Sequence, residues 1–298
     1  MPAFLFPGQG TVRVGMGGWL RRAAAAKQVF DAADDLLSEP ISPLCAKGPL
    51  DRLVATEHAQ RAVTVCNLAA LAVLRAEGHE PELVAGHSVG ELSALHAAGA
   101  LDLEQTLRLV ETRSRLMAEV GGSGGMSAVM GLPVPEVEAL AAAAERDGEP
   151  LVVGLENALG HVVVSGAFPA LERLARLAPK VVPLKVGNAF HSPFMREALP
   201  GWERAVRAAP MREPRFPVVP NLTAQPTTDL AVLREALIGQ LTGRVRWTET
   251  MTHALPLGMC VEVGDSKVLA GLARAAGVRC LSMADPTTPR RLARERAT

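Results

Sequence analysis

The sequence predicts an α/β protein in which a large domain carries a smaller inserted one. Three observations support this prediction. Short apolar runs end in glycine-bounded loops, as where residues 3–6 lead into Pro7-Gly8-Gln9-Gly10, which is typical of buried strands. Longer segments repeat Ala, Val and Leu at three- and four-residue spacing, which predicts helices packed on a sheet. Past residue 125 the order of the two patterns changes, which indicates a second unit.

The elements of the large domain follow from these patterns in chain order. A short apolar strand is expected first, then two helices, then a strand that enters a tight turn and a helix, then one more helix. After the inserted unit the sequence is rich in helix and contains two further apolar strands. The predicted ranges are 3–6, 23–37, 60–76, 83–85, 91–98, 103–120, 216–219 and 260–263,.

The inserted unit begins after a glycine-rich run at residues 121–125, the best candidate for a hinge,. The segments that follow predict the order β-α-β-β-α-β, which is the ferredoxin-like arrangement. We therefore expect a small ferredoxin-like domain at 125–188 and a large α/β domain formed by 1–124 and 189–298. The arginine-rich tail after Pro286 is expected to be solvated and frayed. The predicted ranges of the small domain are 126–132, 135–145, 151–155, 161–166, 169–177 and 180–186.

Composition excludes several function classes. Lys and Arg (31) balance Asp and Glu (31) over 298 residues, so no basic field favours nucleic acid or an anionic membrane as a partner. The four cysteines form no CxxC pair and have no neighbouring histidine cluster, which predicts reduced thiols and no metal site. No charged leader and no long apolar run is present, so we expect a cytoplasmic protein without a membrane segment.

Gly86-His87-Ser88-Val89-Gly90 matches the pattern G-x-S-x-G and lies between a predicted strand and a predicted helix, which is the context this nucleophile motif requires. Glycines flank the serine because the turn is tight and a side chain at either position would collide with its neighbours. The N–H of Val89 opens the helix and would face an oxyanion formed when Ser88 attacks a carbonyl. The alternative is a plain strand-to-helix turn with an incidental serine.

Four segments taken together resemble the malonyl-CoA:acyl carrier protein transacylases and the acyltransferase components of polyketide synthases. The resemblance spans nearly the whole chain. It implies an α/β-hydrolase-like large domain with the inserted ferredoxin-like domain, and a malonyl-CoA:acyl carrier protein S-malonyltransferase activity. The segments are Phe6-Pro7-Gly8-Gln9-Gly10, Gly86 to Glu91, Arg113, and Ala189-Phe190-His191-Ser192.

The resemblance implies a catalytic dyad without a triad carboxylate. Ser88 would be the nucleophile and His191 its general base, with the imidazole held by a backbone carbonyl near Gln240. A Ser-His pair needs only a hydrogen bond between the two and an acceptor that orients the second ring nitrogen. The histidines that carry no motif are expected to be surface or packing residues, namely His58, His79, His96, His161 and His253. A packing role is also the alternative for His191 taken alone. His87 is expected to be a structural or pocket-lining residue.

Gln9 is similar in position to the family glutamine whose backbone N–H supplies the second oxyanion donor beside Val89. The alternatives are that Gly8-Gln9-Gly10 makes only a turn, or that it cradles a phosphate, although it lacks a nucleotide-binding pattern.

Arg113 carries most of the information about the substrate. Its guanidinium would pair bidentately with the free carboxylate of a dicarboxylic acyl group; the alternative is a charge on a solvated helix face. Phe190 resembles the residue of malonyl-selecting members, where a bulky ring would crowd a branched α-carbon. Asn188 stands where the family commonly has His or Ser. The sequence also departs from the family pattern at three other segments, Thr11-Val12, Ala59 to Ala62 and Asn157 to Leu159. In members of the family, the residues at these four places border the acyl pocket.

The resemblance further implies transfer in two half-reactions through an acyl-Ser88 intermediate, from malonyl-CoA to the phosphopantetheine thiol of an acyl carrier protein, for polyketide or fatty-acid synthesis. Neither a metal nor a redox cofactor is implied, and we expect a monomer. Three alternatives stay open: an editing thioesterase on the same fold, a non-catalytic partner-binding subunit, and malonyl transfer within a malonate decarboxylase. The departure at Thr11-Val12 and the low aromatic content favour a stand-alone polyketide enzyme.

Overall fold

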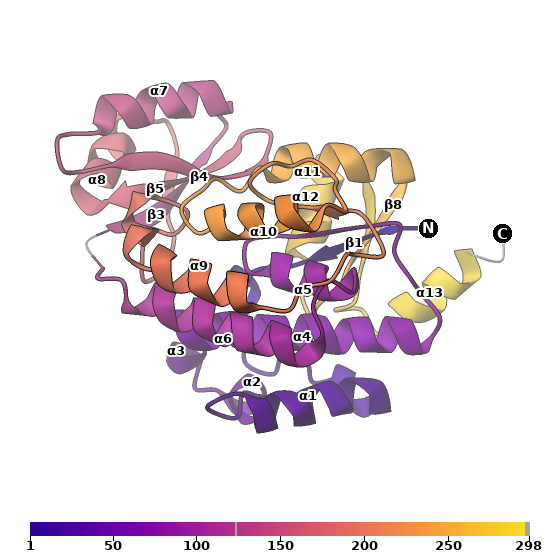
Figure 1. The fold of residues 1–298 in the computed structure, drawn as a ribbon. Coiled ribbons are helices and arrows are strands. Elements are labelled where there is room, and N and C mark those ends of the chain that lie inside the picture. The colour runs from indigo at the N-terminus through magenta and orange to yellow at the C-terminus, as the bar shows by residue number, and fades with distance from the viewer. Residues whose placement is uncertain (123, 296–298) are drawn as a thin grey trace.

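The computed structural model of the 298-residue chain describes residues 1–122 and 124–295 and contains two separate sheets (Figure 1). The first is a five-stranded sheet whose described strands run in the order β7-β2-β1-β8-β9, and every pairing in it is parallel. These strands are β1 (Ala3–Phe6), β2 (Leu83–Gly86), β7 (Val218–Val219), β8 (Met259–Glu262) and β9 (Arg279–Ser282).

The strand order of this sheet determines where a site can form. Along the chain β2 and β7 are added on one side of β1, and β8 and β9 on the other. The order therefore reverses between β1 and β8, and in open parallel sheets ligands bind outside the carboxyl ends of the strands at such a point. β1 is buried along its whole length, as expected for a central strand covered on both faces.

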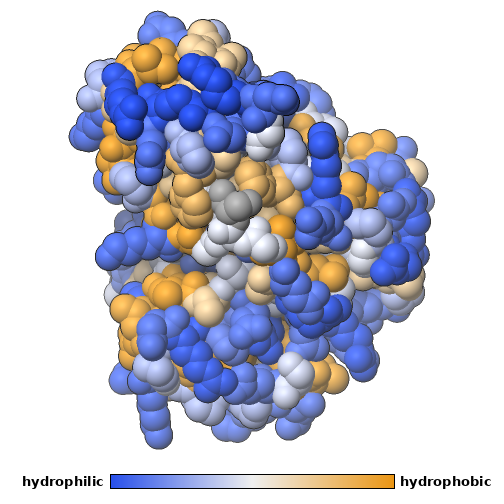
Figure 2. Space-filling view, turned by 90° about the vertical axis from the view of Figure 1, so that its left-hand side faces the viewer, coloured by the Kyte–Doolittle hydropathy of each residue, from blue (hydrophilic) through white to orange (hydrophobic). Residues whose placement is uncertain are grey.

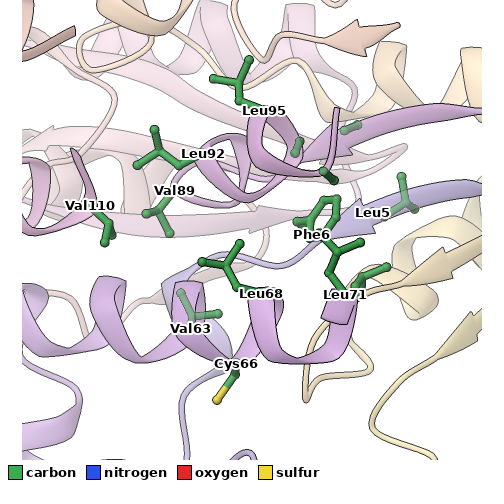
Figure 3. Packing of buried hydrophobic residues seen from close by; sticks show 14 of the residues in the cluster. Leu5, Phe6, Val63, Cys66, Leu68, Leu71, Val89, Leu92, Leu95 and Val110 are labelled. Atoms are coloured by element: carbon green, nitrogen blue, oxygen red, sulfur yellow. The ribbon is translucent and has the colours of Figure 1, made fainter. Parts of the chain in front are cut away.

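Helices cover both faces of the parallel sheet. The longest, α4, packs against α1 and α6, and its apolar side chains Leu68 and Leu71 lie opposite Phe6 and the helix that follows β2 (Figure 3). The helices of the large part are α1 (Ala24–Leu36), α2 (Ser42–Lys47), α3 (Leu50–Leu53), α4 (Thr56–Ala76), α5 (Gly90–Ala97), α6 (Leu103–Glu119), α9 (Leu199–Ala208), α10 (Leu230–Gly239), α11 (Trp247–Ala254), α12 (Val268–Ala275) and α13 (Thr288–Glu295).

The second sheet is antiparallel and has the described strand order β4-β5-β3-β6. It lies at the upper left of Figure 1 together with its two helices. One face packs under those helices, and the other supplies Met126, Leu155 and Val163 to the core of the large part. Its elements in chain order are β3 (Gly124–Met130), α7 (Val134–Ala144), β4 (Leu151–Ala158), β5 (His161–Ala167), α8 (Phe168–Leu177) and β6 (Val181–Pro183).

The predicted mixture of a helix-covered sheet and a separate β-α-β-β-α-β unit is confirmed, with shifts of a few residues at element ends. The prediction for the tail was wrong: α13 is an ordered helix, and its Leu292 is only 3% exposed because it packs into the main core. Strand β9 and the helices around it were not predicted individually. Of the predicted hinge and tail, Ser123 and Arg296 lie outside the described residues.

Within residues 1–122 and 124–295, no helix combines the length and the apolarity needed to cross a bilayer. The same part of the chain holds no group of three or more His, Cys, Asp or Glu side chains arranged to bind a metal ion. The four cysteines are free thiols, three of them buried.

Candidate active site

Ser88 lies at a strained elbow between β2 and α5. Its φ is +53°, a left-handed conformation that a residue with a side chain rarely adopts,. A Cβ added at Gly86 would come within 2.0 Å of the Gly90 backbone, and one at Gly90 within 2.2 Å of the Phe6 carbonyl oxygen. Both flanking positions therefore require glycine, and the predicted collision with neighbouring strand and helix is confirmed.

Asn221, just after β7, binds the backbone on both sides of this elbow. Its Oδ1 accepts a hydrogen bond of 2.7 Å from the Ser88 N–H, and its Nδ2 donates one of 2.6 Å to the Gly86 carbonyl oxygen. One amide thus binds both sides of the turn, and its side chain is fully buried. These bonds offset part of the strain at Ser88.

Ser88 and His191 form a hydrogen-bonded pair, with 2.7 Å between Ser88 Oγ and His191 Nε2. The Nδ1 atom of His191 lies 3.0 Å from the Gln240 carbonyl oxygen and 3.1 Å from that of Gly243. Because both of these oxygens can only accept, Nδ1 carries the proton and Nε2 presents a lone pair to the serine hydroxyl. The hydroxyl is therefore the donor, as a nucleophile and its general base require.

His191 is held as a neutral base. Burial, together with the nearby Arg113 charge, lowers the pKa of His191 to about 3, although the two carbonyl acceptors act in the opposite direction,. Its backbone is also strained, with φ at +55°. The imidazole is thus unprotonated over the whole physiological pH range and is available to accept the serine proton.

Arg113 points from α6 at the same hydroxyl. Its side chain is 1% exposed, so it does not lie on a solvated helix face. Nη2 is 3.3 Å from Ser88 Oγ and 2.9 Å from Gln240 Oε1, while Nη1 donates to Gln60 Oε1 at 2.6 Å. Burial lowers the pKa of Arg113 to about 10, which leaves it cationic at neutral pH. A buried cation therefore adjoins the nucleophile.

A cavity of about 290 Å³ opens in front of Ser88. Its walls come from the loop after β1, from α12 and from the inner face of the small sheet, so it lies at the carboxyl ends of the parallel strands. Hydrophobic residues gather at mid-height of the face drawn in Figure 2, between the part above that carries α7 and α8 and the body below. Besides Ser88 and His191, the lining includes Gln9, His87, Met117, Met126, Leu155, Asn157, Phe190 and Leu269.

Of the two predicted oxyanion donors, Gln9 lines this cavity and Val89 directly follows the nucleophile in the chain. Gln9 begins a short 3-10 helix over Gln9–Thr11 and lines the cavity, while Val89 is the residue that precedes α5. Backbone N–H groups at the start of a helix have no partner within that helix. Both segments thus place such groups beside Ser88.

His87 and Phe190 line the cavity, and Asn188 does not. His87 Nε2 lies 2.8 Å from Asn157 Oδ1, and the His87 ring meets Trp247 edge to face. Asn188 instead donates from Nδ2 to the carbonyl oxygens of Met117 and Val120. Its side chain therefore secures the end of α6.

Four polar side chains of the site were not predicted from the sequence: Gln60, Glu91, Asn221 and the amide of Gln240. A usable signal existed for two of them. Glu91 is the only acidic residue of helix α5, and Asn221 lies two residues after strand β7, at the edge of the sheet where sites form,. Gln60 belongs to α4 and Gln240 directly follows α10, and neither carries such a chemical signal, although Gln60 lies in the segment Ala59 to Ala62 that was expected to border the pocket.

A parallel α/β sheet with a strained, hydrogen-bonded Ser-His pair beyond its strands defines the class of serine-dependent acyl-transfer enzymes. The model of the acyl transferase domain family matches residues 3–264. The chain belongs to this family.

Individual relatives agree along nearly the full length. A malonyl CoA-acyl carrier protein transacylase of Synechocystis is 37% identical over 276 residues, which cover 91% of this chain and 92% of the relative. The solved acyl-carrier-protein S-malonyltransferase of Bartonella henselae has a TM-score of 0.95 at 33% identity, with both chains fully covered. A malonyl-transacylase solved in complex with its type II polyketide synthase acyl carrier protein has a TM-score of 0.89 at 32% identity, with 94% of each chain covered.

Proposed function

We propose that this protein transfers a malonyl group from coenzyme A to the phosphopantetheine thiol of an acyl carrier protein through an ester on Ser88. The observation that carries the proposal is the buried Arg113 guanidinium, 3.3 Å from the Oγ of a serine that is already paired with a neutral histidine. A simple acyl thioester offers nothing to such a cation, whereas malonyl-CoA offers a carboxylate.

In the first half-reaction Ser88 Oγ attacks the thioester carbonyl while His191 Nε2 accepts its proton. The tetrahedral oxyanion is bound by the backbone N–H groups of Gln9 and Val89, and one such donor is typically worth about 3 kcal/mol of transition-state stabilisation. The carbon–sulfur bond then breaks, and the coenzyme A thiolate takes the proton from His191. The malonyl ester of Ser88 remains.

In the second half-reaction the thiol of the carrier's pantetheine arm attacks this ester. His191 accepts the thiol proton and returns it to Ser88 Oγ as the ester bond breaks. Arg113 holds the malonyl carboxylate during both steps. Each terminal nitrogen of its guanidinium carries two N–H groups. The Gln60 amide uses one on Nη1 and the Gln240 amide one on Nη2, while the second N–H of Nη2 faces Ser88 Oγ at 3.3 Å. Loading of Ser88 would release that N–H for the carboxylate, beside the second one on Nη1.

Phe190 supports malonyl over α-branched groups as the substrate, because its ring is nearly buried and forms part of the cavity wall beside His191. His87 supports the shape of the same wall, since its bond to Asn157 joins the elbow to the small sheet. The Asn188 side chain contributes indirectly by fixing the end of α6, the helix that carries Arg113.

The proposal extends to the domain division: a large, α/β-hydrolase-like domain of residues 1–124 and 189–298, and a ferredoxin-like domain of residues 125–188. The serine elbow between strand and helix supports the first description. The element order β3-α7-β4-β5-α8-β6, with the strand order β4-β5-β3-β6, supports the second,.

The test is to incubate the purified protein with malonyl-CoA, methylmalonyl-CoA or acetyl-CoA, without a carrier, and to follow covalent loading by intact mass. We expect a malonyl adduct that Ser88→Ala abolishes. Arg113→Ala should slow malonyl loading by about 100-fold or more, since it removes two charge-assisted hydrogen bonds, and should favour acetyl loading. Steady release of free acid without any adduct would instead indicate an editing thioesterase.

A further inference from the structure

Glu91 is a buried carboxylate that the proposed reaction does not use. It lies in the first turn of α5, three residues after the nucleophile, and its side chain is 1% exposed. Burial raises the pKa of Glu91 to about 7, and hydrogen bonds from Asn221 and Gln240 and the charge of Arg113 limit the rise. An ionisable group is costly to bury, so its partners indicate what it does.

The first partner connects Glu91 to the elbow. Glu91 Oε2 accepts a hydrogen bond of 2.8 Å from the backbone N–H of Asn221. The side chain of Asn221 binds the Ser88 N–H and the Gly86 carbonyl oxygen. The carboxylate therefore fixes the residue that holds the strained serine.

The second partner connects Glu91 to the substrate cation. Gln240 Nε2 donates to Glu91 Oε2 at 2.8 Å and to the Ser88 carbonyl oxygen at 3.1 Å. Because both of these partners accept, the amide nitrogen must face them, and the amide oxygen is left to face Arg113 Nη2 at 2.9 Å,. The carboxylate and the Ser88 carbonyl oxygen thus set together which way the Gln240 amide points, and the carboxylate accepts the shorter bond.

The same Gln240 reaches the general base through its main chain, since its carbonyl oxygen accepts from His191 Nδ1. Glu91 is therefore one hydrogen-bonded residue away from the nucleophile, from the base and from the cation.

We propose that Glu91 is a positioning residue for malonyl loading: by orienting the Gln240 amide it presents Arg113 to the substrate carboxylate beside Ser88. Glu91 touches neither substrate nor reacting atoms and acts only through Gln240 and Asn221. The inference rests on the proposed malonyl transfer. It differs from a purely structural role in one respect: losing the carboxylate must reduce malonyl loading more than acetyl loading, because only the malonyl group uses Arg113.

The experiment compares Glu91→Met with the wild-type enzyme in single-turnover loading from malonyl-CoA and from acetyl-CoA. Methionine keeps the length of the side chain but offers no oxygen to Gln240 Nε2, so the Gln240 amide loses one of the two acceptors that orient it toward Arg113. We expect the ratio of malonyl to acetyl loading rates to fall by about tenfold, the effect of losing one charge-assisted hydrogen bond. Loss of both rates in equal proportion, or no change in either, would overturn the inference.

Glu262→Met is the matched control, because Glu262 is a second fully buried carboxylate, and the N–H group from which it accepts belongs to Ala270 of α12 and not to the elbow or to Gln240. It should leave the loading ratio unchanged. If Glu91→Met does not fold, Gln240→Met is the second test. It removes the side-chain amide and keeps the backbone carbonyl that orients His191, so the ratio of malonyl to acetyl loading should again fall by about tenfold, and an unchanged ratio would contradict the inference. A wild-type enzyme that loads acetyl but not malonyl groups would refute the proposed function itself.

Discussion

Two residues with left-handed backbone meet at the reacting atoms. Ser88 and His191 have φ values of +53° and +55°, and their side chains share a hydrogen bond of 2.7 Å. Each such residue costs of the order of 1–3 kcal/mol, so the surroundings must hold both in place. The Asn221 amide does so for the serine, and the carbonyl oxygens of Gln240 and Gly243 bind the histidine ring.

The low pKa of His191 predicts how loading depends on pH. A free imidazole gains a proton below about pH 6.5, which would block a general base. With a pKa of about 3, His191 stays neutral as the pH falls from 8 to 5, so protonation of His191 should not lower the kcat/KM for malonyl loading over this range, and a decline near pH 7 would come from Glu91. The measurement is the pre-steady-state loading rate at low malonyl-CoA over this range.

Glu91→Gln serves as the control for this profile, because Glu91 is the neighbouring group with a pKa of about 7. A decline near neutral pH that disappears in Glu91→Gln would be assigned to Glu91. A decline that persists in this variant would mean that His191 titrates normally, which would contradict the neutral-base geometry.

At the scale of single residues, sequence reasoning reached the groups that motifs mark and missed those that only the fold brings together. Ser88, His191 and Arg113 stand in recognisable segments, and the structure places the three side chains around one hydroxyl. Asn221 lies 133 positions from Ser88 along the chain, and no local pattern predicts a contact over that separation. Its position at the end of a strand was the only available signal.

At the scale of elements, the contact between β1 and the start of α5 limits what the elbow tolerates. The Phe6 carbonyl oxygen would lie 2.2 Å from a Cβ at Gly90, and both segments belong to the packed core. A clash against backbone is relieved only by moving the strand or the helix.

Gly90→Ala should therefore destabilise the protein although alanine favours helix. We expect a loss of about 3 kcal/mol in the free energy of unfolding, at the upper end of ordinary overpacking, measured by urea denaturation. Gly271→Ala is the matched control, since Gly271 lies in α12 with nothing within 4 Å of its added Cβ, and should stabilise by about 0.5–1 kcal/mol. Equal effects in the two helices would show that the elbow is not tightly packed.

Elements with a strong hydrophobic periodicity, or with clear capping or turn residues at their ends, were predictable from the sequence, and others were not. The helix at 103–120 was predicted within one residue of α6 (Leu103–Glu119), which begins at a capping box in which Asp102 and Gln105 bind each other's backbone,. Strand β9 (Arg279–Ser282) was not predicted from the sequence. It has only four residues, which include a charged arginine and a partly buried cysteine, and they show no alternation of apolar and polar side chains. Its strand conformation comes from pairing with β8, a tertiary effect that overrides local propensity.

At the scale of the whole molecule, the small sheet belongs to two cores at once. Val129, Val162 and Val164 pack under α7 and α8, whereas Met126 and Leu155 join the core of the large part. Backbone bonds add to this connection: Val245 N–H donates to the Gly154 carbonyl oxygen, and Glu156 N–H donates to that of Val245, each at 2.8 Å. A cavity shared by both parts thus has walls that are bonded to one another.

These connections predict that the two parts unfold together. All three tryptophans, Trp19, Trp202 and Trp247, lie outside residues 125–188, so their fluorescence reports the large part, whereas far-UV circular dichroism reports both. The two urea transitions should coincide, as in a single cooperative unit. Val164→Ala, a truncation inside the small part's own core, should lower both midpoints equally, with a loss of about 2 kcal/mol. If the variant instead lost circular dichroism before its fluorescence changed, the small part would be an independently unfolding lid, and the contacts around Val245 would contribute little to holding the cavity closed.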